Sequence, residues 1–162
     1  MEVIALTTVS GNAPVSHTSA NALKIASAFG MNCPVYAGCE KSMSNAYEYP
    51  TQFHGKTGMD SAGSEFVNHG LSLAEGHAVN AMVDLVEKYS NDISIVAIGP
   101  LTNIATALMI APDMATKVKE LIIMGGGHNF GNITPAAEFN IWADPVRHAS
   151  FFKVESRSLS LG

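Results

Sequence analysis

Short apolar runs alternate along the chain with longer segments in which apolar residues recur at helical spacing. Two runs, at 93–98 and 120–124, are rich in Ile and are followed by Gly, which is typical of buried strands. This alternation predicts an α/β fold with a mostly parallel sheet and helices on both faces. The expected strands are 3–9, 35–37, 93–98 and 120–124; the expected helices are 15–29, 71–89, 103–111 and 144–152; 40–63 is expected to be a loop.

Local breakers explain several of these boundaries. Gly30 ends the first expected helix, Asn91-Asp92 turns the chain before a strand, and Pro112 ends a helix because it keeps the preceding residue out of the α region. The loop at 40–63 is too long to be a simple connection in a compact domain, so we expect it to be functional or mobile.

Composition narrows the class of protein. The 162 residues fit one domain, and a charged fraction of only 14% fits a sheet buried on both faces. Nine Lys and Arg against fourteen Asp and Glu, without a basic stripe, exclude nucleic acid as an expected partner. No apolar run approaches the roughly 20 residues of a membrane span, and no signal peptide is recognised, so we expect a cytoplasmic protein. Cys33 and Cys39 are expected to be reduced thiols.

Polar residues follow the two Ile-rich strands. The first strand leads into Gly99-Pro-Leu-Thr-Asn103, and the second leads into Gly125-Gly-Gly127 and then Ala137-Glu-Phe-Asn-Ile-Trp-Ala-Asp-Pro145. Ligands of open α/β sheets bind outside the carboxyl ends of the strands. Glu138 and Asn140 would share one face of an extended segment, where an amide and a carboxylate could bind the hydroxyls of a polyol. The alternative is that these side chains only form Asx-turns.

These motifs resemble the inosine-uridine-preferring nucleoside hydrolase family, calcium-dependent enzymes that cleave the N-glycosidic bond of ribonucleosides. Thr7-Thr-Val-Ser-Gly-Asn12 and His54-Gly-Lys-Thr-Gly58 match the same family, and the resemblance runs from about Glu2 to Pro145. It implies a partial nucleoside-hydrolase-like α/β domain at 1–152, followed by a divergent tail at 153–162. The family's Asp-rich strand end, D-x-D-x-x-x-D-D, and its later Asp-x-Thr-His-like segment do not appear in this sequence.

The resemblance implies a role for each residue of a ribose site. Glu138 and Asn132 would hold the 5′-hydroxyl, and Asn140 would hold the 2′,3′-diol. Met124 would pack near the sugar, and Asn12 would complete the pocket from the first strand.

The resemblance also implies a calcium ion, for which this sequence offers one ligand, the main-chain oxygen of Thr102. The alternative for Thr102 is an ordinary turn in which it caps the next helix. His54 would lie on the base side, where a histidine suits proton transfer, although the family's main catalytic Asp and His are absent from this chain. Asp144 is expected to cap a final helix that has Pro145 at its first position.

The expected function is therefore hydrolysis of ribonucleosides to ribose and free base, with only trace activity in this chain alone because the calcium carboxylates are missing. The alternative is an inactive nucleoside-binding module that associates with a full-length partner, and a fragment of a larger polypeptide is a third option. The expected partner is a small-molecule ribonucleoside, and association with a second copy of the chain is left open.

Overall fold

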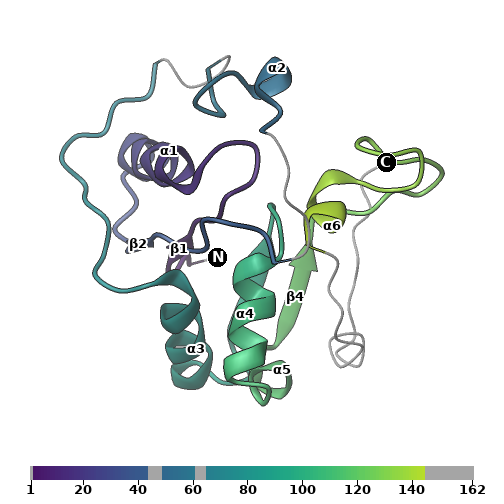
Figure 1. Cartoon of the computed structure of the whole chain (residues 1–162). Helices are drawn as coiled ribbons and strands as arrows, with labels where there is room; N and C mark the ends of the chain where they lie inside the picture. The colour runs from purple at the N-terminus through teal and green to yellow at the C-terminus, as the bar shows by residue number, and fades with distance from the viewer. Residues whose placement is uncertain (1, 44–48, 61–64, 145–162) are drawn as a thin grey trace. The chain divides into compact units, whose positions relative to one another are not determined.

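The computed structural model describes residues 2–43, 49–60 and 65–144. The chain divides into two compact units, the first from residues 1–41 and 47–78 and the second from 42–46 and 79–162. The elements (Figure 1) are, in chain order, β1 (Leu6–Thr7), α1 (Val15–Ala28), β2 (Val35–Tyr36), α2 (Thr51–His54), α3 (Ala78–Lys88), β3 (Ser94–Ala97), α4 (Thr102–Ile110), α5 (Met114–Lys117), β4 (Glu120–Ile123) and α6 (Phe139–Ala143).

The first unit contains a two-stranded parallel sheet with α1. Strand β1 pairs with β2, and the hydroxyls of Thr8 and Ser19, both buried, share a hydrogen bond of 2.7 Å that links the end of β1 to α1. Gly30 has a φ of 62° just beyond α1, which confirms the predicted helix end. The predicted strand at 3–9 is wrong in length, since only Leu6–Thr7 is a strand.

The predicted start of the helix at 71–89 is also wrong. Residues 71–77 are not helical, and α3 begins at Ala78. The amide of Ala74 donates to the carbonyl of Val35 at 2.8 Å, so this segment runs beside β2. Gly76 has a φ of 96°, which a helix does not allow. The apolar spacing of this segment was therefore overridden by pairing with a distant strand.

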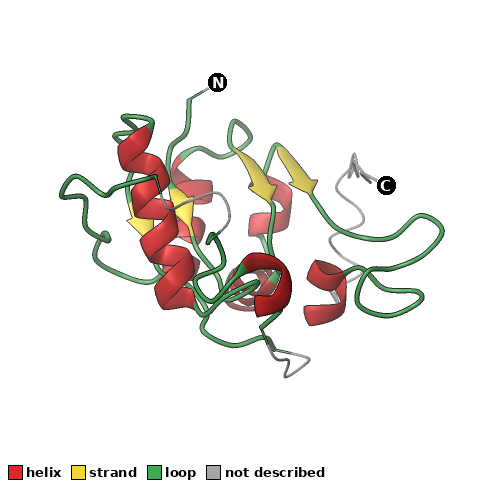
Figure 2. Ribbon diagram, turned by 90° about the horizontal axis from the view of Figure 1, so that it is seen from above, coloured by secondary structure: helices red, strands yellow, loops and turns green. Residues whose placement is uncertain are grey.

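The second unit contains the other parallel pair, β3 and β4, which Figure 2 shows as adjacent arrows pointing the same way. Ala97 lies opposite Ile123 in this pair. Helix α4 ends at Ile110, two residues before Pro112, as predicted. The short helix α5 was not predicted. The core of this unit comes from α3, α4, α5 and β4, and its buried residues include Val86, Leu101, Ile104, Leu108, Met114 and Leu121.

One face of β3 is not buried. Val96 is 55% exposed and Ile98 is 72% exposed, whereas Ala97 between them is 8% exposed. Alternate residues of a strand point to opposite faces of a sheet, so β3 has one covered face and one open face in the described structure. The expectation that this strand is buried on both faces is therefore wrong for the described residues.

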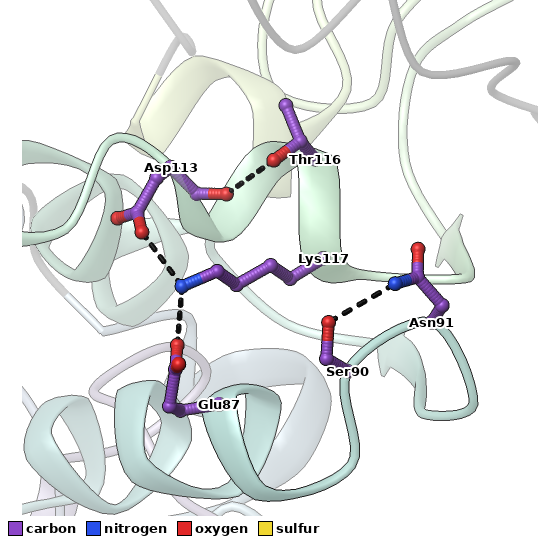
Figure 3. Close-up of polar contacts among 6 residues, drawn as sticks. All are labelled: Glu87, Ser90, Asn91, Asp113, Thr116 and Lys117. Carbon is purple, nitrogen blue, oxygen red and sulfur yellow. Dashed lines mark hydrogen bonds and ion pairs between the residues drawn. The ribbon is translucent and has the colours of Figure 1, made fainter.

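A lysine connects α5 to α3 in the second unit. The ammonium of Lys117 is 2.7 Å from a carboxylate oxygen of Asp113 and also pairs with Glu87 on α3 (Figure 3). The hydrogen bond with Lys117 lowers the pKa of Asp113, and the hydrogen bonds with Asp113 and Glu87 raise the pKa of Lys117. This ion-pair group lies on the surface, away from the motifs at the strand ends.

The predicted fold class is confirmed, because both strand pairs are parallel and alternate with helices along the chain. Cys33 and Cys39 are thiols that form no disulfide, as expected. Among the described residues no helix has the length and apolar character needed to cross a membrane. The predicted helix at 144–152 and the predicted tail at 153–162 lie outside the described residues, apart from Asp144 itself.

Candidate functional site

Glu138 lies directly before α6, the helix within the motif at 137–145. It has an extended backbone, with φ −83° and ψ 148°, and is the N-cap residue of α6. Its carboxylate accepts hydrogen bonds from the amides of Asn140 at 3.0 Å and Ile141 at 3.3 Å. The same carboxylate accepts the amide of Gly126 at 3.1 Å. The prediction of an extended segment is therefore wrong at Asn140, which lies in the first turn of the helix.

Asn140 joins this helix to the end of β4. Its side-chain nitrogen donates to the carbonyl of Met124 at 3.0 Å and lies 3.7 Å from the sulfur of the same residue. Asn140 is 5% exposed. Within the described part of the chain, its side-chain oxygen Oδ1 has no hydrogen-bond partner. This oxygen can accept a hydrogen bond from a ligand hydroxyl.

In Asn132 the bonded atom is the side-chain oxygen, whereas in Asn140 it is the side-chain nitrogen. Its oxygen accepts the amide of Phe139 at 2.8 Å, and over residues 2–43, 49–60 and 65–144 no partner is found for its side-chain nitrogen. The loop before it folds back tightly, since a Cβ on Gly131 would lie 2.1 Å from the carbonyl oxygen of Ala137. Only glycine fits there. The tight turn thus leaves an amide donor of Asn132 for a ligand.

The structure therefore brings together four predicted residues, Met124, Asn132, Glu138 and Asn140 (Figure 1, the end of β4 and α6). They offer an acceptor, a donor and a carboxylate oxygen, Oε1 of Glu138, that accepts one hydrogen bond from the part of the chain that the structure describes. Met124, 40% exposed, adds an apolar surface. Acceptors and donors interleaved in this way suit a small molecule with several hydroxyl groups.

Thr102 lies elsewhere in the second unit, at the first residue of α4, and is 1% exposed. The alternative prediction that it caps this helix is wrong, because Leu101 is at the N-cap and no side chain caps α4. The Thr102 hydroxyl instead donates to Asp144. Its main-chain oxygen, the predicted metal ligand, accepts the hydroxyl of Thr106 at 2.8 Å in addition to the helical amide four residues on.

The donor set near Thr102 does not fit a calcium ion. Calcium takes about six to eight oxygen ligands, most of them carboxylates, and both lone-pair directions of the Thr102 carbonyl already accept hydrogen bonds. The described residues contain no group of three or more His, Cys, Asp or Glu side chains able to hold a metal. We therefore derive no step of a reaction through a metal.

Asp144 has hydrogen-bond partners that the sequence did not predict, while the helix that it was predicted to cap lies outside the described residues. It is the C-cap residue of α6 and 2% exposed. Its carboxylate accepts the hydroxyl of Thr102, the hydroxyl of Ser42 at 3.0 Å and the amide of Met43 at 2.8 Å. These partners are 42, 102 and 101 residues away in sequence, so no local pattern could have identified them.

The two remaining predicted residues belong to the first unit. Asn12 is exposed in the turn before α1, and His54 is the exposed last residue of α2. Their loops meet, because a Cβ on Gly58 would lie 2.9 Å from the Cβ of Ala13. Asn21 on α1 also donates to the carbonyl of Thr57 at 2.8 Å. The loop after His54 is therefore anchored against the turn that carries Asn12.

Asp60 closes the loop that follows His54. Its carboxylate accepts the amides of Lys56 at 2.8 Å and Thr57 at 3.2 Å, together with the Thr57 hydroxyl. The hydrogen bond from the Thr57 side chain, followed by that from the Lys56 amide, lowers the pKa of Asp60. This carboxylate stabilises the turn that follows His54.

The chain is similar to known ribonucleoside hydrolases. The pyrimidine-specific ribonucleoside hydrolase RihB of Escherichia coli is 36% identical over 145 residues, which are 90% of this chain and 46% of RihB. The purine-preferring ribonucleoside hydrolase of Gardnerella vaginalis superimposes with a TM-score of 0.85 at 29% identity, covering 98% of this chain and 51% of that one. A plant nucleoside hydrolase superimposes with a TM-score of 0.82 at 32% identity, covering 99% of this chain and 51% of the plant enzyme.

The chain spans about half the length of the relatives it matches. Residues 1–155 match the family described as inosine-uridine preferring nucleoside hydrolase. This match covers both units and every motif discussed above. The chain therefore belongs to the inosine-uridine preferring nucleoside hydrolase family.

Proposed function

We propose that this chain recognises the ribose of a ribonucleoside for hydrolysis of its N-glycosidic bond. In this reaction water adds to the anomeric carbon of the sugar while the bond to the base breaks, giving ribose and free base. The observation that supports the proposal is a set of three polar atoms beside α6: over the described residues, Asn140 Oδ1 and Asn132 Nδ2 have no partner, and Glu138 Oε1 accepts one hydrogen bond. Ribose presents hydroxyls that both donate and accept, and these atoms complement them.

The proposed roles follow from which side-chain atoms already form hydrogen bonds within the protein. Asn140 accepts from the 2′,3′-diol, while Asn132 donates to the 5′-hydroxyl and Glu138 accepts from it. Met124 packs against the sugar, since its exposed thioether lies beside the Asn140 amide. The roles of Asn12 as a ribose contact and of His54 near the base are proposed from the family resemblance alone. RihB is named for pyrimidine nucleosides and the Gardnerella enzyme for purine nucleosides, so the relatives support ribonucleosides as a class and not one base.

A second candidate is a nucleoside-binding module without turnover that associates with a full-length partner. The observation that favours it is the poor fit of the Thr102 region to calcium. Calcium dependence remains a proposal, in which Thr102 would give its main-chain oxygen. The two candidates differ in one measurement: metal-dependent release of reducing sugar from inosine or uridine, abolished by EDTA, supports the hydrolase and contradicts the binding module.

Asn132→Asp tests the proposed ribose site with little disturbance. Aspartate keeps the oxygen that accepts the Phe139 amide but replaces the free amide donor with an oxygen. We expect weaker binding of inosine and uridine in a calorimetric titration, by about tenfold for one lost hydrogen bond. Asn129→Asp, which makes the same charge change at an exposed position of the same loop, is the control. Equal affinities for the two variants would contradict the proposal.

A further inference from the structure

Asp144 is a buried acidic residue to which the proposed function gives no role. A buried carboxylate is costly unless hydrogen bonds compensate for lost water. Here three donors do so, from Thr102, Ser42 and Met43. A helix can end on a glycine or an asparagine without such a group, so termination of α6 does not explain it.

The three partners of Asp144 come from two separate segments of the second unit. Oδ2 binds the first residue of α4, and Oδ1 binds the segment Ser42–Met43. The Ser42 hydroxyl also lies 2.6 Å from the carbonyl of Ala143, the last residue of α6. The C-terminus of α6 is thus tied to both segments.

Helix α6 needs such ties because it is only five residues long. A helix this short is unstable by itself, since the cost of forming the first turn is not recovered. Glu138 holds its N-terminus through Gly126, and Asp144 holds its C-terminus. Asn140 lies between these two fixed points, and its orientation decides whether Oδ1 can face a ligand.

We propose that Asp144 is a positioning residue: through Thr102, Ser42 and Met43 it fixes the orientation of α6 and of the Asn140 amide. The proposal rests on the proposed function only in taking Asn140 as a ligand-binding group. The positioning itself is a property of the ligand-free protein.

The test measures the amide cross-peaks of the Asn140 side chain and the Gly126 backbone in ¹⁵N-labelled chain without ligand. Asp144→Ala removes all three contacts. Thr102→Val removes one of them, because it replaces the threonine hydroxyl with a methyl group of nearly equal volume. We expect both variants to shift or broaden these cross-peaks. Thr102→Ser, which retains the hydroxyl, is expected to keep them at the wild-type positions.

Thr8→Val is the matched control. It also removes a buried threonine hydroxyl, one that binds Ser19 at 2.7 Å in the first unit. We expect it to lower stability, and since the hydrogen bonds of Thr8 to Ser19 and to the Tyr36 carbonyl lie within the first unit, the two reporter cross-peaks are expected to stay in place. Reporters that move equally in Thr8→Val and Thr102→Val would show a general loss of stability and overturn the proposal.

Unchanged reporters in folded Asp144→Ala and Thr102→Val would also overturn it. If Asp144→Ala does not fold, Thr102→Val and Ser42→Ala each remove a single donor and decide the question by the same readout. A separate titration of the wild-type chain with inosine tests the proposed function. Reporters that respond to Thr102→Val but not to inosine would leave the positioning role standing and the ribose site refuted.

Discussion

Replacing Glu138 with alanine should release α6 from the rest of the second unit. The carboxylate accepts three amides, two in the first turn of the helix and one from Gly126. Loss of an N-cap costs about 1 kcal/mol, and loss of a hydrogen bond to a charged group costs about 1.5–3 kcal/mol. The sum, about 3 kcal/mol, is a large part of the roughly 5–15 kcal/mol that stabilises a domain.

The single tryptophan of the chain provides a local assay, because Trp142 lies in α6. Urea unfolding followed by Trp142 fluorescence reports on this helix, whereas far-ultraviolet circular dichroism reports on all the helices. In Glu138→Ala we expect the fluorescence transition to move to lower urea than the dichroism transition. Such a separation is the signature of local unfolding, as opposed to a uniform loss of stability.

Two further variants sharpen the test. Glu138→Gln keeps the shape and one oxygen but turns an amide group toward a backbone donor, so an intermediate effect is expected. Glu75→Ala changes an exposed glutamate of the first unit and should alter stability by less than about 0.5 kcal/mol. If Glu138→Ala behaves like Glu75→Ala and both probes still report one transition, the capping argument fails.

Three other outcomes follow from the structure. Because the pKa of Asp113 is lowered, its carboxylate stabilises the fold at pH values above its ordinary pKa of 3.8, and this contribution is lost as the pH falls through the lowered pKa. In Lys117→Met, the urea midpoint of unfolding should therefore depend less on acid pH. Gly131→Ala should disrupt the loop, detected as a lower Tm than Gly30→Ala, because only the first places a Cβ against a carbonyl. The exposed Val96 and Ile98 should promote association; light scattering should show larger species for the wild type than for Val96→Thr/Ile98→Lys, and a monodisperse wild type would contradict this.

The sequence predicted helices well where their ends have local causes. Gly30 and Pro112 act through their own backbone restrictions, and both helix ends lie within two residues of them. The segment at 71–77 failed because its conformation depends on β2, about forty residues earlier, to which it donates a hydrogen bond. Helical spacing of apolar residues says nothing about such a distant partner, and the left-handed Gly76 was the one local sign against a helix.

For the candidate site, too, local features could be predicted from the sequence and contacts between distant residues could not. The types of Asn132, Glu138 and Asn140 could be recognised from sequence, because neutral amides and a carboxylate after a strand suit hydroxyl groups. Their geometry could not, since the cap that makes α6 a helix also uses the amide of Gly126, twelve residues before Glu138. Asp144 is the extreme case, because the three hydrogen bonds described for its carboxylate come from residues about forty or a hundred positions away. Residues that meet a ligand can carry a chemical signature in sequence, whereas the distant partners of a residue that holds them in place are identified only from the structure, so variants at Thr102 and Asp144 test contacts that the sequence did not predict.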